Sequence, residues 1–306
     1  MTREQLLKKQ KMAFAAGKTL ELSFRRAALQ RLKGAIEQFQ PEIEAALKAD
    51  LNKSEFETYM TETGLTLSAL SYTLSRLGSW MRRRMAPTPL AQFPSLSFTV
   101  REPYGTVLIL APWNYPFLLA MEPLIGAIAA GNCCVVKPSE YAPHTAAVVK
   151  KIVEKALPSW LAAVITGEKA VSEELLDSPF DYIFFTGSPA VGKDAARLTP
   201  VTLELGGKSP CIVDESANIP IAAKRIVFGK FLNGGQTCVA PDYILVQSGV
   251  KKELVWWIKY WIRKQFGENP LQNENYPKII NQRHYTRLLK LLEGQKLLEK
   301  GQWRED

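Results

Sequence analysis

The sequence predicts an α/β fold: a Rossmann-like parallel sheet with helices on both faces, preceded by a helical segment and followed by an incomplete second α/β domain. From residue 106 onward, short apolar runs alternate with amphipathic stretches, which is the pattern of parallel strands joined by right-handed helical crossovers. Residues 2–84 instead repeat apolar positions at intervals of three and four, which predicts helices. After residue 207 only two clear strand signals remain, and two strands are few for an independent domain.

The first 84 residues are helical in pattern, because residues 2–84 are rich in Leu, Ala, Lys and Glu and contain four glycines and one proline. Pro41 is expected to begin a new helix. The three prolines of APTPLAQFPS (86–95) end the helical pattern. LSFTVREPYG (96–105) then alternates every second residue and predicts a strand or hairpin.

The central region predicts five strands and four helices. The strands are expected in TVLILAP (106–112), NCCVVKPSE (132–140), LAAVITG (161–167), DYIFFTG (181–187) and VTLELGG (201–207). The helices are expected in FLLAMEPLIGAIAA (117–130), HTAAVVKKIVEKAL (144–157), KAVSEELLD (169–177) and SPAVGKDAARL (188–198). Ligands bind beyond the carboxyl ends of the strands in open sheets of this kind, so the strand ends are where chemistry is expected.

The last hundred residues predict fewer strands. Strands are expected in CIVDES (211–216) and YILVQSG (243–249), and helices in residues 219–232, 251–266 and 281–300. We therefore divide the chain into residues 1–206, the N-terminal helices with a nucleotide-binding type of sheet, and residues 207–306, a partial second domain.

Composition excludes several classes of protein. The chain is 46% hydrophobic and 23% charged, as folded globular proteins are. Its net charge of +9 is mild for its length, so Arg82, Arg83 and Arg84 are interpreted as a solvated helix end and not as a nucleic-acid site. The aromatic stretch 254–262 is interpreted as core or interface packing, with a membrane-surface helix as the alternative.

The four cysteines form no CxxC pair, so neither a disulfide framework nor a metal site is predicted. A reducing compartment, the cytoplasm, is expected. The charged N-terminus lacks the apolar core of a signal peptide, and the longest apolar runs are roughly ten residues, too short for a membrane span.

Five short motifs carry candidate site residues, four of them at the ends of predicted strands, and each has a structural alternative when it is read alone. Asn114 in APWNYPF is suited to donate to a developing oxyanion or to tie its own turn. Lys137 and Glu140 in KPSE are suited to bind a ribose or to form a surface turn. Gly187 and Gly192 in FTGSPAVGK are suited to approach a phosphate or to make a tight strand-to-helix turn.

The last two motifs carry a carboxylate and a thiol. Glu204 in LELGGKSP lies between leucines, where desolvation would raise its pKa toward that of a general base; the alternative is an outward-pointing strand residue. Cys238 in FLNGGQTCVAPDY is a candidate nucleophile, or else a small packing residue.

Taken in order, WNYP, KPSE, FTGSPAVG, LELGGKSP and GQTC resemble the motifs of the aldehyde dehydrogenase superfamily. APWNYP, LTPVTLELGGKSP and GQTCVAPDY are most similar to its class 3 branch, which acts on fatty and aromatic aldehydes. The resemblance implies NAD, or else NADP, as the cofactor, an aldehyde substrate and a homodimer. It implies oxidation through a cysteine thiohemiacetal and thioester.

The resemblance also implies roles for individual residues. Cys238 aligns with the nucleophile, Asn114 with the oxyanion-hole amide and Glu204 with the general base. The cofactor contacts align with Trp113, Lys137, Glu140, Gly187, Ser188, Val191 and Gly192.

The sequence departs from the family at its end, because it stops before the acidic-aromatic EIFGP motif. The resemblance therefore implies a chain truncated at its C-terminus. Two alternatives to full activity stay open: a catalytically impaired remnant that keeps a nucleotide-binding scaffold, and a cofactor-independent esterase that uses the same Cys and Glu.

Overall fold

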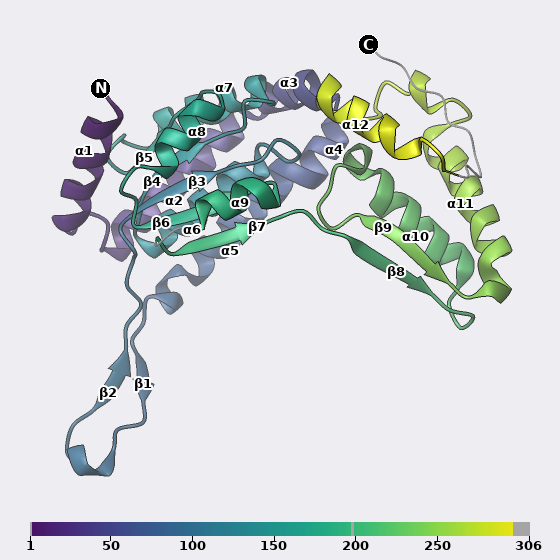
Figure 1. The fold of residues 1–306 in the computed structure, drawn as a ribbon. Coiled ribbons are helices and arrows are strands. Elements are labelled where there is room, and N and C mark those ends of the chain that lie inside the picture. The colour runs from purple at the N-terminus through teal and green to yellow at the C-terminus, as the bar shows by residue number, and fades with distance from the viewer. Residues whose placement is uncertain (1, 197–198, 296–306) are drawn as a thin grey trace. The chain divides into compact units, whose positions relative to one another are not determined.

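The computed structural model describes residues 2–196 and 199–295, and the chain forms two compact units (Figure 1). The first unit comprises Met1–Ile43 and Tyr59–Glu204, and the second comprises Glu44–Thr58 and Leu205–Asp306. A short N-terminal segment thus belongs with the C-terminal third of the sequence, which no local pattern indicated.

The N-terminal region is helical, as predicted. Its helices are α1 (Arg3–Ala15), α2 (Leu22–Gln38), α3 (Gln40–Leu51), α4 (Glu55–Thr58) and α5 (Gly64–Trp80), with a π-helix, η1 (Tyr59–Thr63), before α5. Thr2 and Gln5 cap α1 reciprocally, each side chain bonding to the backbone of the other. Pro41 lies at the second position of α3, which confirms the expected helix start.

The first unit is built on a five-stranded parallel sheet with the order β5-β4-β3-β6-β7. Its strands are β3 (Thr106–Leu110), β4 (Cys133–Lys137), β5 (Ala162–Val164), β6 (Tyr182–Thr186) and β7 (Val201–Glu204). Every residue of β3 and β4 is buried, which explains why these strands are continuous apolar runs without alternation. The predicted α/β class is confirmed.

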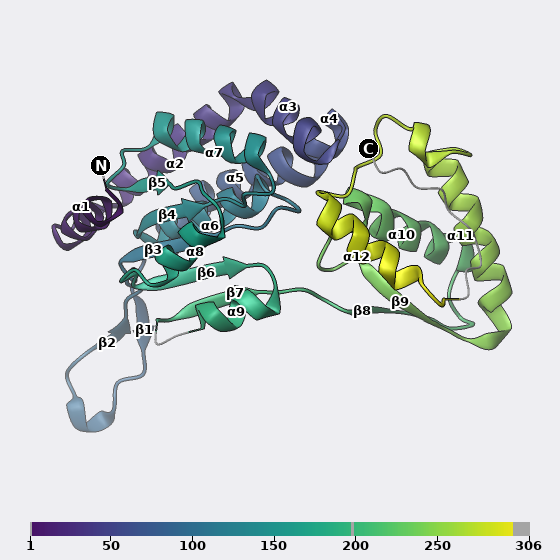
Figure 2. The same ribbon diagram turned by 45° about the horizontal axis from the view of Figure 1, so that its top comes forward.

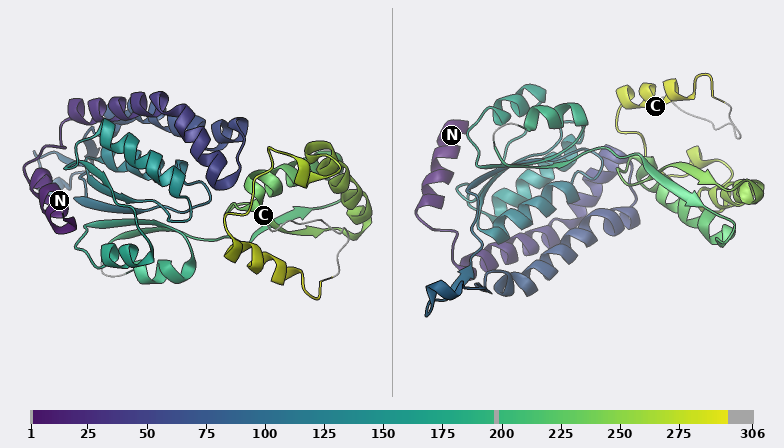
Figure 3. Two further views of the ribbon diagram at one scale, coloured as in Figure 1. Left: turned by 90° about the horizontal axis from the view of Figure 1, so that it is seen from above. Right: turned by 60° about the horizontal axis from the view of Figure 1, so that its bottom comes forward.

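Helices cover both faces of this sheet. The crossover helices are α6 (Leu118–Ala130), α7 (Pro143–Ala156), α8 (Lys169–Leu176) and α9 (Pro189–Ala195). Helices α6 and α7 pack on one face, with α2 outside them, and α8 and α9 lie on the other (Figures 2 and 3). The strand order reverses direction between β3 and β6, so this pair forms the topological switch point.

The amino ends of β3 and β6 are held by side chains. Asn132 accepts from the Gly105 N–H at 3.0 Å, and Asp181 accepts from the Thr106 N–H at 2.7 Å. Gly105 has φ of +137°, and a side chain there would collide with Asp181. The close approach of Asp181 therefore requires glycine.

A hairpin projects from the first unit (Figure 1), formed by β1 (Arg84–Ala86) and β2 (Ser97–Thr99), with a short 3₁₀ turn, η2 (Leu90–Gln92), at its tip. The expected strand over 96–105 is confined to β2. Arg82, Arg83 and Arg84 are exposed, as the interpretation as a solvated helix end expected, but α5 ends before them at Trp80 and Arg84 instead pairs with Thr99. The guanidinium of Arg83 lies 4.7 Å from the ring centre of Phe98, a cation–π contact across the hairpin.

The second unit contains a two-stranded parallel sheet of β8 (Ser209–Val213) and β9 (Pro241–Val246). Its remaining elements are α10 (Ile219–Phe231), η3 (Leu232–Gly235), η4 (Ser248–Val250), α11 (Lys251–Phe266), η5 (Pro270–Gln272) and α12 (Gln282–Leu292). Its core contains Val213, Ile219, Ala223, Ile226 and Leu254, three of which lie on α10. Trp257 and Trp261 pack against this core.

The final helix is shorter than predicted. It ends at Leu292 and is followed by a turn at Gly294, whose φ is +71°. A residue in that conformation commonly follows the last turn of an α-helix, so α12 ends before the predicted end at residue 300. Residues 296–300 of the predicted helix lie outside the described residues.

Candidate active site

The predicted strand-end residues of the first unit lie along one edge of its sheet. The register places Leu110 opposite Lys137 and Phe185, and Thr186 opposite Glu204. Because all five strands are parallel, the segments that follow β3, β4, β6 and β7 leave the sheet at the same edge. The structure therefore gathers there every predicted site residue except Cys238.

The loop after β3 carries Trp113 and Asn114, both half-buried. It is anchored at its start by the Ala111 N–H, which donates to the Lys137 carbonyl oxygen at 3.0 Å. Its end runs into α6, where the Leu119 N–H donates to the Tyr115 carbonyl oxygen at 3.0 Å. Asn114 is thus held between a strand end and a helix start at the switch point.

Lys137 and Glu140 form an ion pair at the end of β4. The Lys137 Nζ lies 2.5 Å from the Glu140 Oε2, and the side chain of Lys137 is 3% exposed against 30% for Glu140. A buried ammonium group needs a partner, and Glu140 supplies it. The pair presents a cation and a partly exposed carboxylate where the sequence expected cofactor contacts.

The turn after β6 brings backbone close to the sheet edge. The Gly187 N–H donates to the Glu204 carbonyl oxygen at 2.9 Å, which ties this turn to the end of β7. A Cβ at Gly187 would lie 2.6 Å from the Phe185 ring, so no side chain is accommodated. The Ser188 hydroxyl caps α9 by accepting from the Val191 N–H at 3.4 Å, and Gly192 is buried in that short helix.

Glu204 is the last residue of β7, and it is exposed. The structure therefore does not provide the burial that its leucine neighbours suggested.

Cys238 belongs to the second unit, and its side chain is exposed. It follows three consecutive residues in the left-handed region: Asn233 with φ of 53°, Gly234 with 60° and Gly235 with 79°. Such a run is open to glycine and only tolerated by asparagine, which explains the NGG sequence. Gly207 approaches the Cys238 carbonyl so closely that a Cβ there would collide with it.

Gln236 fixes the cysteine loop from within. Its side-chain amide donates to the carbonyl oxygens of Asn233 and Lys278, each at 3.0 Å, and its Oε1 accepts from the Ile280 N–H at 3.0 Å. This glutamine therefore joins the loop to the segment that precedes α12.

The other cysteines are less suited to react. Burial raises the pKa of Cys133 to about 12, and it raises the pKa of Cys134 well above its ordinary value. Burial also raises the pKa of Cys211, which is half-buried. The thiolate is the reactive form of cysteine, and burial disfavours it in these three side chains. Cys238 is the exposed cysteine, so it is the most accessible thiol for covalent chemistry.

Two carboxyl groups outside the predicted motifs contact these loops. Glu62 accepts from the backbone at the start of α6, and Glu57 accepts from the backbone of Asn233. No sequence motif marks these two residues, because a glutamate in a helical segment carries no local sign of a contact with residues far away in the chain.

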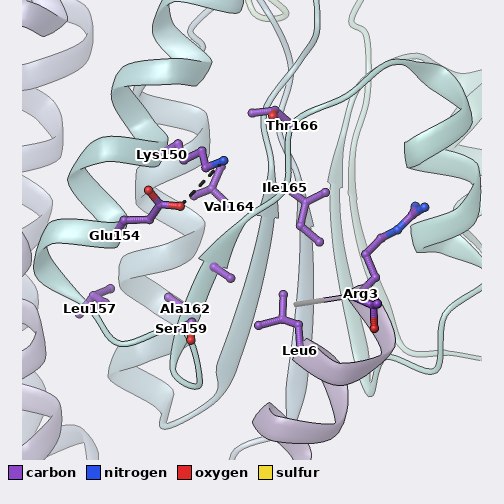
Figure 4. Close-up of a pocket in the computed structure, with 12 residues that line it drawn as sticks. Arg3, Leu6, Lys150, Glu154, Leu157, Ser159, Ala162, Val164, Ile165 and Thr166 are labelled. Carbon is purple, nitrogen blue, oxygen red and sulfur yellow. Dashed lines mark ion pairs between the residues drawn. The ribbon is translucent and has the colours of Figure 1, made fainter.

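A cavity of about 440 Å³ in the first unit lies away from the predicted site residues. It follows the edge strand β5 between α1 and α7 (Figure 4). An ion pair on its lining joins Lys150 and Glu154 across 3.9 Å, and both side chains are exposed. None of the predicted site residues lines it, so we do not assign it to the active site.

Within residues 2–196 and 199–295, no group of three or more His, Cys, Asp or Glu side chains is placed to hold a metal ion. In the same residues, no helix is both long enough and apolar enough to cross a membrane.

The fold is an open, doubly wound α/β sheet, a class in which ligands ordinarily bind beyond the carboxyl ends of the strands at the switch point. The chain belongs to the aldehyde dehydrogenase family, whose sequence pattern matches residues 2–301. It is 47% identical over 294 residues to the 4,4'-diaponeurosporen-aldehyde dehydrogenase of Staphylococcus aureus, a match that covers 94% of this chain and 64% of that protein.

It is 41% identical over 304 residues to aldehyde dehydrogenase family 3 member A2 of Macaca fascicularis, covering 98% of this chain and 63% of that one. The structure of the substrate-bound state of Staphylococcus aureus AldH superposes with a TM-score of 0.92 at 46% identity, over 95% of this chain and 65% of that chain. The predicted family is confirmed, and the chain spans less than two thirds of the length of either relative.

Proposed function

We propose that the protein oxidises an aldehyde to the carboxylic acid with NAD or NADP, through a covalent intermediate on Cys238. The observation that carries the proposal is the exposed thiol of Cys238, which follows a left-handed stretch of backbone and lies on a segment that Gly207 approaches closely. Family membership supplies the reaction class. The resemblance to class 3 favours a medium-chain, long-chain or aromatic aldehyde.

Each proposed role follows from the chemistry of the side chain. The Cys238 thiolate attacks the carbonyl carbon, and the new oxyanion accepts from the Asn114 amide and the Cys238 N–H. When bound, the nicotinamide cofactor supplies the hydride acceptor that allows the thiohemiacetal to become a thioester. Glu204 then takes a proton from water, which attacks the thioester and releases the acid and the free thiolate.

The edge of the five-stranded sheet suits a dinucleotide. Lys137 supplies a buried cation, and Glu140 supplies a partly exposed carboxylate, which together suit ribose hydroxyls. The turn at Gly187 leads directly into the start of α9, where backbone N–H groups suit a phosphate. Ser188, Val191 and Gly192 follow Gly187 in the sequence, and Trp113 lies in the loop after β3; these four residues complete the proposed cofactor contacts.

The test is to incubate the purified chain with a long-chain or aromatic aldehyde and NAD or NADP, and to follow the reduced nicotinamide by absorbance. We expect turnover that Cys238→Ser lowers by about 10³-fold or more, since serine is a far weaker nucleophile. Cys211→Ser is the matched control and should retain turnover.

Turnover that persists in Cys238→Ser would contradict the proposed nucleophile. Cofactor binding by calorimetry without turnover would favour the nucleotide-binding scaffold instead. Ester hydrolysis that requires Cys238 but no cofactor would favour the esterase.

A further inference from the structure

We infer that Glu62 and Glu57 are positioning residues, each holding the backbone of one loop that the proposed function places in the active site. Glu62 acts on the loop that carries Asn114, and Glu57 acts on the loop that carries Cys238. This inference rests on the proposed function for the roles of Asn114 and Cys238, and on the contacts within each unit for the rest.

Glu62 caps a helix to which it does not belong. Its side chain lies in the π-helix η1 and is completely buried. One carboxyl oxygen, Oε2, accepts from the N–H groups of Phe117 and Leu118, each at 2.9 Å. The first turn of α6 has no acidic residue and no side-chain cap of its own, so Glu62 satisfies two of its free N–H groups.

The capped residues lie immediately after the loop of Asn114. The loop begins at Ala111, whose N–H is bonded to β4, and ends at Phe117, whose N–H is bonded to Glu62. Both ends are therefore fixed by hydrogen bonds to other elements. An amide that stabilises an oxyanion must be in place before the charge develops, and a loop fixed at both ends provides this preorganisation.

Glu57 performs the same task in the second unit. Its side chain is 9% exposed, and its Oε1 accepts from the Asn233 N–H at 2.7 Å. Burial, and after it the charge on Glu57, raise the pKa of Tyr276 in the same unit. Asn233 has φ of 53°, an uncommon conformation for a residue with a side chain, and it persists only where the surroundings impose it.

Glutamine offers a conservative replacement at both sites. Its side-chain carbonyl oxygen accepts the same backbone N–H groups but carries no charge, whereas alanine removes the acceptor. A role in holding the backbone predicts that glutamine largely preserves function and that alanine does not. The comparison of Gln and Ala variants therefore separates the hydrogen bond from the charge.

The first experiment measures amide hydrogen exchange in the full chain. We expect Glu62→Ala to speed exchange at Phe117 and Leu118 by about tenfold or more, while Asn233 stays as in the wild type. Glu57→Ala should speed exchange at Asn233 and leave Phe117 and Leu118 unchanged. The Gln variants should stay close to the wild type at all three positions.

The second experiment compares two reactions of Cys238, neither of which needs a cofactor. Acylation by p-nitrophenyl acetate develops an oxyanion, whereas alkylation by iodoacetamide does not. We expect Glu62→Ala to slow acylation by about tenfold and to leave alkylation at the wild-type rate. We expect Glu57→Ala to change both rates, because it loosens the loop that carries the thiol.

A general loss of stability in Glu62→Ala would change the rates of both acylation and alkylation. The ratio of the two rates therefore separates a positioning effect from unfolding. An unchanged ratio in Glu62→Ala, or an alkylation rate unchanged in Glu57→Ala, would overturn the inference for that residue. If the Cys238→Ser variant is acylated at the same rate as the wild type, the proposed function is overturned. Amide exchange would still report whether the two carboxyl groups hold their loops.

Discussion

The two parallel sheets of this protein differ in how they are covered. In the five-stranded sheet, β3 and β4 are buried at every position and helices pack on both faces. In the two-stranded sheet, α10 and α11 form the core with Cys211 and Val213, whereas Ile212 is 74% exposed and Leu245 is 55% exposed. Parallel sheets are ordinarily covered on both faces, so β8 and β9 are less protected than the strands of the five-stranded sheet.

This difference separates a scaffold from a reactive loop. The well-covered sheet carries the residues proposed to bind the cofactor, which need fixed positions. The thinly covered unit carries the exposed thiol, which needs access. Burial therefore protects Cys133 and Cys134 of the first unit from the covalent chemistry that Cys238 is proposed to perform.

The largest expected effect is a difference in thiol reactivity between the units. With a pKa of about 12, Cys133 has a thiolate fraction of about 10⁻⁴ at pH 8, and burial also blocks access. We expect iodoacetamide to modify Cys238 first, Cys211 more slowly, and Cys133 and Cys134 more than about 10³-fold more slowly. Peptide mass spectrometry over time measures this order.

Denaturation is the control for the labelling. In urea that unfolds the chain, all four thiols should react at similar rates, since burial causes the difference. Rapid labelling of Cys133 in the native protein would show that the five-stranded sheet opens and would remove the contrast.

A mid-sized effect is expected from truncating apolar side chains in the two sheets. Leu108 is completely buried, so Leu108→Ala should lower the free energy of unfolding of the first unit by about 2–5 kcal/mol. Ile212→Ala removes a mostly exposed side chain and should change it by about 0.5 kcal/mol or less. Urea unfolding followed by circular dichroism measures both.

Leu254→Ala is the matched control, because Leu254 is buried in the core of the second unit. It should destabilise that unit as strongly as Leu108→Ala destabilises the first. If Ile212→Ala proves as costly as Leu254→Ala, the open face of β8 is covered in solution.

The smallest expected effect is a pH dependence in α12. Burial lowers the pKa of His284, and the neighbouring charges of Arg287 and Arg283 lower it further. Because the folded state disfavours the protonated form, the contribution to stability is complete above the unfolded value of 6.5 and is lost as the pH falls from there through the lowered pKa. His284→Gln should flatten this dependence in urea midpoints between pH 5 and pH 8, and an equal slope in the variant would exclude His284 as its source.

Local patterns predicted the elements well where local contacts decide them. The apolar runs at 106–110 and 133–137 are strands, and the three-and-four spacing of the first 80 residues forms helices. The helical pattern was misleading at its end. Arg84 continues a helical stretch in the sequence, but in the structure it pairs with Thr99 in a hairpin. Sequence spacing describes each segment separately, and strand pairing depends on two of them.

The candidate site shows the same division. The sequence motifs identified Asn114, Lys137, Glu140, Gly187 and Glu204. These residues lie along one edge of the sheet because its parallel strands end there. Glu57 and Glu62 were not marked, since their partners lie 176 and 55 or 56 residues away. A carboxyl group that caps a remote backbone leaves no periodic signal.

The sequence by itself determined the α/β class, the family and the motifs, because these depend on the order of residues along the chain. Only the tertiary structure decided that Glu204 is exposed, that Lys137 is buried against Glu140, and that residues 44–58 belong with the cysteine loop. The physical reason is that burial, ion pairing and capping depend on which segments meet in space. The same reason explains why the thiol is identified from its motif, whereas the carboxyl groups that hold its loop are identified only from their contacts.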